Sequence, residues 1–350
     1  MIKVLHISIN AHNCKNKFLP NYKVFLEAEF SKVHNDFIYL GDHTGLVIDE
    51  KTLIIPDEFY SAIKILISVN KYNKVIFHSL PSNKILFVLS FFIGRFSHID
   101  FVLWGGEIHH KNVMASSIRS KVKNYFAKQF LRKIKNYITY IKSDFELIQL
   151  ISKNSNLINL GAIYPSNICG QIESDTIIHK TDNRVLIGNS AIKRNNHFDV
   201  IKKLASKKLN NIDVYLPLAY GNVGDYSDSL IKYTANHLSY CRVHPLMNFI
   251  EFESYLRLLS TMTAAIFYND GQQAMGNILQ LFYYKVKVFL KKDSNAWCLV
   301  TELGFVVYSI DDFNLELDEL VLEENKNNAI RLFSYQTTTN HYERYFSSIK

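Results

Sequence analysis

Short apolar runs alternate with longer segments of helical periodicity through the first half of the chain. Runs that are apolar throughout are typical of strands buried on both faces, and apolar residues three or four apart are typical of helices packed on a sheet. The expected strands are Lys3–Ile9, Phe37–Leu40, Leu53–Ile55, Lys74–Phe77, Phe101–Trp104, Ile138–Ile141 and Leu157–Ile163. The expected helices are Asn21–Lys32, Phe59–Val69, Lys84–Phe96, Ile118–Ile134 and Phe145–Ile151.

The alternation restarts after a polar and uneven stretch, residues 166–183, which we interpret as a linker. Strands are expected at Arg184–Ile187, Asp213–Leu216, Ala264–Phe267, Val286–Leu290 and Val306–Tyr308. Helices are expected at Asn195–Leu204, Tyr226–His237, Phe249–Ser260 and Asn295–Leu303. Strands that alternate with helices in this way predict an α/β protein built on doubly wound parallel sheets.

The pattern predicts two Rossmann-like domains, one over residues 1–170 and one over residues 184–330. Residues 331–350 contain a last helix-like segment, His341–Phe346, which we expect to cross back to the first domain. Two such domains that face each other form a deep cleft between the carboxyl ends of their strands, where ligands bind in folds of this kind.

Composition and charge narrow the class of partner. The chain has 350 residues, a formal charge of +8 and a pI near 9.0, so we expect an anionic partner: a nucleotide, a phospholipid surface or nucleic acid. Four scattered cysteines without a Cys-x-x-Cys pair fit a reducing cytoplasm and argue against a zinc site. The N-terminus does not resemble a signal peptide, and the longest apolar run, Ile85–Ile93, is too short to span a membrane.

A polar turn and a helix start lie between two expected strands, within the stretch Tyr268–Leu290. Small residues and amides occupy this turn, which carries Gly271 and Gly276. A helix start presents backbone N–H groups and the positive end of the helix dipole, which suits a phosphate or diphosphate. The same residues also fit an ordinary polar loop between a strand and a helix.

Several nucleotide-binding signatures are missing from the sequence. No Gly-x-Gly-x-x-Gly follows the first strand, and no Gly-x-x-x-x-Gly-Lys-Ser/Thr loop occurs. No zinc finger, RNP or helix-turn-helix pattern indicates nucleic acid. A transferase of nucleotide-diphosphate sugars therefore fits best, and a two-domain binding protein or dehydrogenase is the competing interpretation.

The segment Trp104–His110 follows an expected buried strand and carries chemistry. Gly105 and its neighbouring glycine bring the backbone close to a ligand, and Glu107 beside His109 has the features of a general base for a sugar hydroxyl. The alternatives are a turn with a solvated glutamate and surface histidines, and a metal site, which lacks further ligands. No Asp-x-Asp occurs, which disfavours a metal-bound nucleotide.

Polar groups also follow the strands of the second domain. Donors to an anion are expected from Gly188, Asn189 and Ser190 after one strand, and from Asn195 and His197 at a helix start; simple helix capping by Asn195 or Asn196 is the alternative. The remaining candidates are Tyr215, Pro217 and Tyr220, with an aromatic ring that can stack on a base, and the pair Lys292 and Trp297.

These blocks, in this order, resemble glycosyltransferase family 56, the TDP-N-acetylfucosamine:lipid II N-acetylfucosaminyltransferase (4-alpha-L-fucosyltransferase) family. The resemblance covers Val4 to about Phe346. It rests on His78, Trp104, Gly105, Glu107, Gly188, Asn189, Ser190, Asn195, His197, Pro217, Tyr220, Phe252, Tyr255, Leu256, Leu258, Leu259, Gln272, Gln273, Gly276 and Trp297. The family usually has arginine at Gly271, glycine at Ala274, aspartate at Glu107 and a polar residue at Ile192.

The resemblance implies a metal-independent enzyme of the two-domain GT-B fold without cofactors. It would move a deoxy-amino sugar such as Fuc4NAc from dTDP to an undecaprenyl-diphosphate-linked oligosaccharide, as a peripheral protein at the cytoplasmic face of the bacterial inner membrane. Enterobacterial common antigen and O-antigen are the expected products. The departures leave open a UDP-sugar donor, or a non-catalytic subunit that binds nucleotide sugars or assembles polysaccharide.

Roles follow from the resemblance for individual residues. The C-terminal domain would hold the donor, with its diphosphate near Ser190 and the helix start, contacted by Gln272, Gln273, Gly276 and Asn277. Lys292 would replace the missing basic contact and Trp297 would meet the sugar. The N-terminal domain would supply Glu107 as the base, with His109 as its substitute and with His78, Trp104 and Gly105 on the acceptor side.

A basic helix is the last expected feature. Residues 118–135 contain many lysines and arginines and no acidic residue, which suits contact with an anionic membrane surface. The apolar helix over Ile85–Ile93 is a second candidate for this contact. The alternative is a helix that packs on the core and keeps a solvated basic face. We expect no nucleic-acid partner.

Overall fold

The computed structural model describes residues 1–10, 18–41, 48–105, 118–172, 183–207, 211–221, 224–271 and 273–349. The chain forms two compact units. The first contains Met1–Ser166 and Thr338–Lys350, and the second contains Asn167–Thr337. The structure defines each unit by itself, so the cleft expected between them stays a prediction.

The first unit is built on a parallel sheet of seven strands in the order β3-β2-β1-β4-β5-β6-β7. β1 pairs with β2 on one side and with β4 on the other, so successive connections run outward in opposite directions from this point. Such a topological switch point is where open α/β sheets bind ligands. The strands are β1 (Ile2–Asn10), β2 (Val33–Gly41), β3 (Thr52–Ile55), β4 (Lys74–Phe77), β5 (Ile99–Val102), β6 (Asn136–Ile138) and β7 (Asn156–Ile158).

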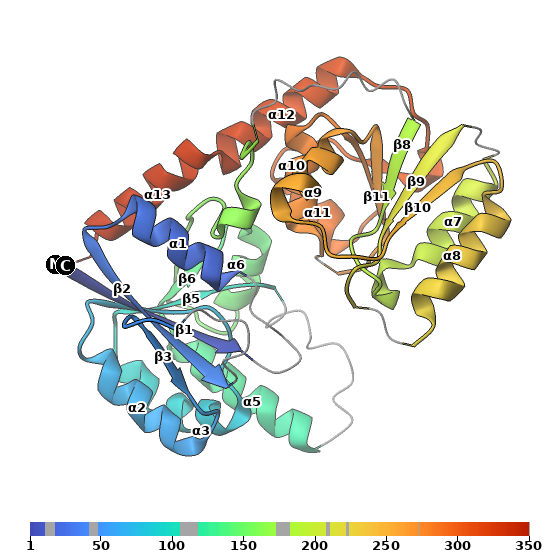
Figure 1. Cartoon of the computed structure of the whole chain (residues 1–350). Helices are drawn as coiled ribbons and strands as arrows, with labels where there is room; N and C mark the ends of the chain where they lie inside the picture. The colour runs from blue at the N-terminus through green and yellow to red at the C-terminus, as the bar shows by residue number, and fades with distance from the viewer. Residues whose placement is uncertain are drawn as a thin grey trace. The chain divides into compact units, whose positions relative to one another are not determined.

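Helices cover both faces of this sheet (Figure 1). Buried residues of four helices pack with the strands on one face. These helices are α2 (Phe59–Val69), α3 (Asn83–Phe92), α5 (Ile118–Lys133) and α6 (Lys142–Gln149). On the other face, aromatic rings join α1 (Leu19–Glu29) to the last helix, α13 (Tyr335–Ser347).

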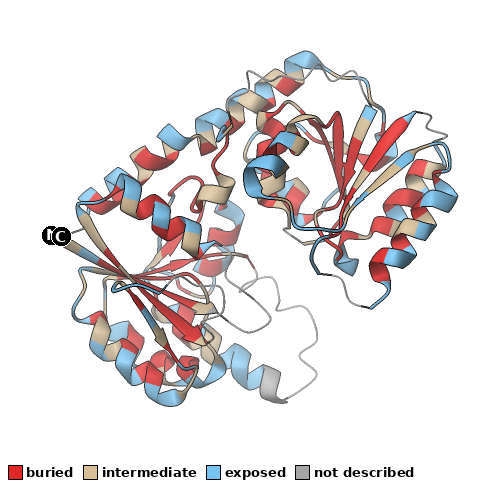
Figure 2. Ribbon diagram, in the orientation of Figure 1, coloured by how far each residue is buried: buried red, intermediate tan, exposed pale blue. Residues whose placement is uncertain are grey.

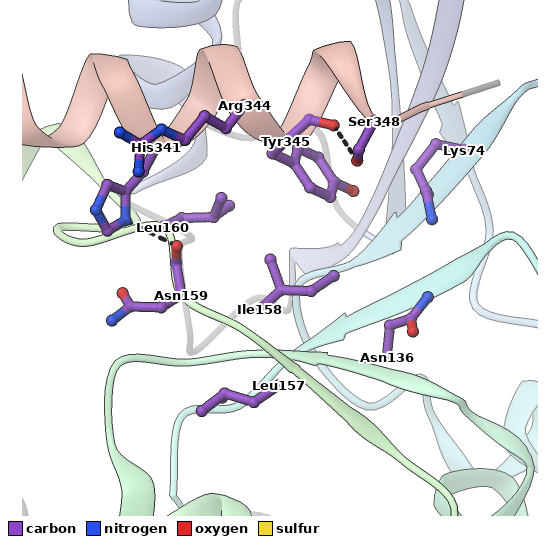
Figure 3. Close-up of a pocket in the computed structure, with 10 residues that line it drawn as sticks. All are labelled: Lys74, Asn136, Leu157, Ile158, Asn159, Leu160, His341, Arg344, Tyr345 and Ser348. Atoms are coloured by element: carbon purple, nitrogen blue, oxygen red, sulfur yellow. Dashed lines mark hydrogen bonds between the residues drawn. The ribbon is translucent and has the colours of Figure 1, made fainter.

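A buried carboxylate fastens α13 to the sheet. Asp100, fully buried in β5, accepts hydrogen bonds from the Tyr345 hydroxyl (2.6 Å), the Asn136 amide (2.7 Å) and the Lys74 amine (3.1 Å). Tyr342 of the same helix donates to the Ile163 carbonyl at 2.6 Å. These bonds place the C-terminal segment in the first unit. An open cavity of about 440 Å³ lies beside α13 (Figure 3), and Lys74, Asn136 and Tyr345 are among the residues that line it.

The second unit repeats this architecture with six parallel strands in the order β10-β9-β8-β11-β12-β13. Its switch point lies between β8 and β11, which pair directly. The strands are β8 (Asn183–Ile187), β9 (Ile212–Pro217), β10 (Arg242–Leu246), β11 (Ala264–Phe267), β12 (Lys287–Leu290) and β13 (Tyr308–Ser309). The helices are α7 (His197–Ala205), α8 (Tyr226–His237), α9 (Phe252–Ser260), α10 (Met275–Tyr283), α11 (Asn295–Glu302) and α12 (Glu319–Phe333).

Two elements of the second unit differ from the expectations. β10 is a strand where none is expected, because its sequence Arg-Val-His-Pro-Leu carries the polar residues and the proline that an edge strand tolerates. α12 is a helix of fifteen residues with a mixed polar sequence, so its apolar spacing is weak. β10 was missed because tertiary contact stabilises it: Arg242 and His244 of β10 bind Asp213 of β9. α12 does carry a local signal, the Asp318 side chain that accepts from the Leu320 and Val321 N–H groups.

Hydrogen bonds show to which unit the segment around Cys169 belongs. Cys169 pairs with Ser334 in an isolated bridge, and its backbone N–H donates to the Phe333 carbonyl at 2.8 Å. The second unit therefore begins at Asn167, near the start of the stretch that we expected to be a linker (residues 166–183). It extends to Thr337.

Candidate active site

The loops after β8, β9, β11 and β12 meet at the carboxyl edge of the second sheet. This edge contains the switch point between β8 and β11, where the Gly188 N–H donates to the Ile266 carbonyl at 2.9 Å. The Asn196 side-chain amide donates to the Tyr268 carbonyl at 2.8 Å and joins the loop after β8 to the loop after β11. The structure thus brings several of the predicted donor residues to one edge of one sheet.

Gly188 makes a turn that no other residue fits. Its φ is +72°, and a Cβ at this position would lie 2.3 Å from Nε2 of His197. The His197 ring is fully buried beneath the turn, and its Nδ1 is hydrogen-bonded to the Tyr226 hydroxyl at 3.0 Å. Burial lowers the pKa of His197 to about 4, so the ring is neutral at pH 7 and supports the turn without adding charge.

The asparagines in this region do not cap α7, in contrast to the simple capping interpretation. The Asn195 amide donates to the backbone oxygen (2.9 Å) and the hydroxyl (3.0 Å) of Ser190, which holds the loop after β8 in a closed shape. Asn196 occupies the N-cap position of α7 with φ +51° and makes no capping bond with its side chain. Its amide contacts the neighbouring loop instead.

Two amide–phenol pairs lie beside this turn. Asn189 donates to the Tyr220 hydroxyl at 3.2 Å, and Asn277 donates to the Tyr255 hydroxyl at 2.9 Å. Burial, and then the nearby Tyr220, raise the pKa of Tyr255, so its phenol is neutral at pH 7. Tyr255 of α9 had only the family resemblance to recommend it, because a tyrosine on an amphipathic helix normally belongs to the core.

The start of α10 presents backbone donors. The first intrahelical bond there is from the Ile278 N–H to the Ala274 carbonyl, so the N–H groups of Met275, Gly276 and Asn277 precede the helical ladder. Ala274 adopts φ +60° and offers no side-chain cap, which leaves this end open to an anion. Gln273 is half-buried just before the helix, and the predicted Gln272 lies outside the described residues.

The remaining donor candidates lie less centrally. Lys292 is exposed after β12, whereas its neighbour Lys291 forms an ion pair with Asp270. Trp297 lies in the first turn of α11, where its backbone N–H binds the Ser294 hydroxyl at 3.2 Å. Pro217 is buried at the end of β9.

Tyr215 is not positioned as expected. Its ring stacks on His244 of the neighbouring edge strand, with centroids 4.6 Å apart. It lies two residues before the end of β9 and not in the loop that follows, so its ring is engaged within the strand pair.

The carboxyl edge of the first sheet is organised by a buried chain of hydrogen bonds. His6 of β1 is joined through Nε2 to the Asn35 amide oxygen (3.1 Å) and through Nδ1 to Nε2 of His78 (3.0 Å). Nδ1 of His78 is joined to the Tyr164 hydroxyl at 2.6 Å. The Trp104 indole N–H donates to the His78 carbonyl at 2.6 Å, and its ring stacks on Tyr164 with centroids 4.8 Å apart.

His6 and His78, the two histidines in this series of hydrogen bonds, are both neutral at pH 7. Burial lowers the pKa of His6 to about 4, and burial together with the nearby His6 lowers the pKa of His78 well below its usual value. His78 is 1% exposed and both of its ring nitrogens have partners, so its position suits support of Trp104 and not proton abstraction from a substrate. The sequence analysis missed His6 because a histidine within an apolar strand resembles an ordinary core residue.

The predicted base and its substitute, Glu107 and His109, lie outside the described residues. The described range that precedes them ends at Gly105, which directly follows Trp104. Gly105 is buried and has φ +80°. In the described ranges, no three His, Cys, Asp or Glu side chains are grouped to hold a metal ion. No helix in the described part of the chain is long and apolar enough to span a membrane.

The whole chain has the architecture of known glycosyltransferases. Anabaena HepE in complex with UDP and glucose aligns with a TM-score of 0.64 and 12% identity, covering 98% of this chain and 99% of HepE. The lipopolysaccharide outer core galactosyltransferase WaaB in its apo form aligns with a TM-score of 0.64 and 10% identity, covering 99% of both chains. A glycosyltransferase from Rickettsia africae aligns with a TM-score of 0.62 and 10% identity, covering 99% of this chain and 98% of that one. The fold is therefore the GT-B fold.

The sequence identifies the family within that class. A model of the family described as 4-alpha-L-fucosyltransferase, glycosyl transferase group 56, matches residues 52–335. The chain belongs to this family, and the protein is a glycosyltransferase.

Proposed function

We propose that the protein transfers a deoxy-amino sugar, Fuc4NAc or a close relative, from dTDP to an undecaprenyl-diphosphate-linked oligosaccharide during synthesis of a bacterial surface polysaccharide. The observation that carries the proposal is the uncapped start of α10, which lies at the carboxyl edge that contains the switch point of the second sheet. The family and the fold support a nucleotide-sugar donor, and HepE, a protein of the same fold, is described in complex with UDP.

The leaving diphosphate develops negative charge as the sugar departs. The N–H groups of Met275, Gly276 and Asn277 and the dipole of α10 stabilise that charge without a metal ion. The Gly188 turn, held over the buried His197 ring, lies at the same edge of the sheet, and Lys292 adds a cation. Gln272, Gln273 and the hydroxyl of Tyr220 bind the phosphates or the sugar. No cofactor takes part.

The acceptor hydroxyl loses its proton to Glu107, which lies three residues after Trp104 in the sequence. The buried histidine chain orients Trp104 from beneath, through the carbonyl of His78. The half-buried Trp104 then meets the acceptor, and the buried Gly105 follows it in the chain. His109 is the substitute base. The acceptor is lipid-linked, so the enzyme works at the cytoplasmic face of the inner membrane, on an anionic surface that attracts the basic residues of 118–135.

A donor panel tests the proposal. The purified chain is given dTDP- and UDP-linked sugars with a lipid-linked acceptor in detergent, and release of nucleoside diphosphate is measured. We expect release of dTDP that depends on acceptor. Release of UDP alone would show that the donor is a UDP-sugar and not a dTDP-sugar. Binding of a nucleotide sugar without turnover of any would favour a non-catalytic subunit.

A further inference from the structure

The outer faces of α2, α3 and α5 carry large apolar side chains. Seven of them are 43% to 59% exposed, although a helix that covers a sheet normally presents polar residues to water. We call this set the outer ridge: Phe59, Ile63, Ile67, Phe87, Phe91, Val122 and Tyr125. Figure 2 shows exposed residues along the outer sides of these three helices, whereas their inner residues are buried in the core.

Ring contacts make the outer ridge continuous across the three helices. Phe87 of α3 contacts Phe59 of α2 (centroids 6.3 Å apart) and Phe126 of α5 (4.9 Å). Phe91 and Tyr125 also contact Phe126, at 6.2 Å and 5.3 Å. A connected apolar surface of this kind normally marks an interaction site.

The charge of the three helices themselves is positive, and the nearby Glu58, which precedes Phe59, is paired with Lys84 of α3 at 2.7 Å. The sequences of α2, α3 and α5 contain no Asp or Glu. α5 contributes six basic residues, of which Lys121, Lys123, Lys128 and Arg132 are exposed. A basic, aromatic surface complements an anionic interface that has an apolar interior, where aromatic side chains reach below the headgroups and lysines meet phosphates.

We infer that the outer ridge is the surface by which the protein docks on an anionic phospholipid bilayer, with the aromatic residues of α2 and α3 inserted and the cations of α5 on the headgroups. The inference rests on the proposed lipid-linked acceptor and extends it, because it adds α2 to the basic helix and the apolar helix over Ile85–Ile93 and makes the three one continuous surface.

Co-sedimentation of the full chain with vesicles tests the inference without any substrate. One set of vesicles is phosphatidylcholine, and the other is equal parts of phosphatidylcholine and phosphatidylglycerol. We expect the anionic vesicles to bind the protein at least about tenfold more tightly at about 0.1 M salt, and the preference to weaken as salt rises.

Two variants separate the two kinds of contact. Changing Phe87→Ser and Phe91→Ser together should weaken binding to anionic vesicles about tenfold, because apolar area no longer leaves water. Changing Lys121, Lys123, Lys128 and Arg132 to Gln should weaken it about 600-fold, since each basic residue near the surface contributes about fivefold. Two control variants make matching changes outside these three helices. Leu150→Ser with Leu320→Ser removes exposed apolar side chains, and changing the exposed Lys142, Lys153, Lys202 and Lys232 to Gln removes four cations.

Equal binding to both kinds of vesicle, or wild-type binding by the Phe87 and Phe91 variant, would overturn the inference. So would a dimer in light scattering without vesicles that this variant abolishes, since the outer ridge would then be covered by a second copy. Transfer to a detergent-solubilised acceptor should survive in both variants. An inactive wild type that still binds anionic vesicles would refute the proposed function and leave the docking surface intact.

Discussion

The two switch points use the same topology for opposite purposes. In the second unit, the carboxyl edge of the sheet is lined by Gly188, Asn196 and the start of α10, where Ala274 makes no side-chain capping bond. In the first unit, the equivalent edge is filled by the rings of His6 and His78 and the Trp104–Tyr164 stack. The edge for which we propose anion binding has backbone donors at a helix start, and the other edge is packed with neutral aromatic groups.

The difference shows how charge is handled at each edge. A departing diphosphate, as proposed, needs fixed donors, and the left-handed residue Ala274 directly precedes the backbone N–H groups at the start of α10. The packed edge of the first unit holds its histidines neutral by burial, and thus offers a rigid, uncharged base for Trp104. If the second unit binds the donor and the first unit serves the acceptor, a substitution in one unit should impair one of these functions and leave the other unchanged.

The largest effect is expected from Glu107→Gln. Loss of a general base should lower kcat by about 10²–10⁴-fold and leave dTDP binding unchanged, because the base belongs to the acceptor side. Steady-state kinetics and isothermal titration with dTDP measure the two properties. The exposed Glu343→Gln serves as the matched control. Turnover near that of the wild type would move the role to His109, and weakened dTDP binding would break the comparison.

Gly188→Ala should damage the donor edge instead. The added Cβ meets Nε2 of His197 in a conformation that L-residues rarely adopt, so we expect the free energy of unfolding to fall by about 2–4 kcal/mol and dTDP binding to weaken. Urea unfolding and titration with dTDP measure both. Gly271→Ala is the stability control, since a Cβ there meets nothing within 4 Å. Unchanged stability in the Gly188 variant would show that the turn can relax.

Acid should destabilise the protein before it titrates most carboxylates. An unfolded histidine has a pKa near 6.5, whereas His6 and His197 have a pKa of about 4 in the folded state. The unfolded chain therefore binds more protons between these values, and stability present above pH 6.5 is lost as pH falls toward 4. Each histidine should contribute up to about 3 kcal/mol over this range.

Urea unfolding from pH 8 to pH 5 measures this slope. No contribution from these histidines is expected between pH 8 and pH 7, where they are neutral in both states. The His6→Gln variant should lose its share of the slope below pH 6.5. A variant that keeps the full slope would show that His6 accepts a proton in the folded protein.

The smallest effect is expected at Asn196, where two substitutions separate two causes. Asn196→Gly loses the hydrogen bond to the Tyr268 carbonyl but keeps the left-handed conformation, which should cost about 1 kcal/mol. Asn196→Ala loses the bond and also strains the backbone, for about 1–2 kcal/mol more. Thermal unfolding distinguishes them. Equal stability of the two variants would mean that the backbone relaxes out of the left-handed region.

Local pattern was enough to predict the two parallel sheets, because buried strands and amphipathic helices each leave a signal within about ten residues. It also located the Gly188 turn and the helix start after Gly271, since only certain residues suit such backbone. It failed for β10, where pairing with β9 and the bonds of Asp213 outweigh a polar sequence.

The sequence by itself determined which residues can bind an anion or move a proton, because that is a property of their chemistry and their neighbours along the chain. Tertiary structure alone decided that His6 and His78, seventy-two positions apart, share a hydrogen bond. It also decided that Tyr345 reaches Asp100 and that Phe87 joins Phe59 to Phe126 on one surface. No local pattern encodes these contacts, because they arise only when strands align and bring distant side chains to the same depth of the core or the same outer face.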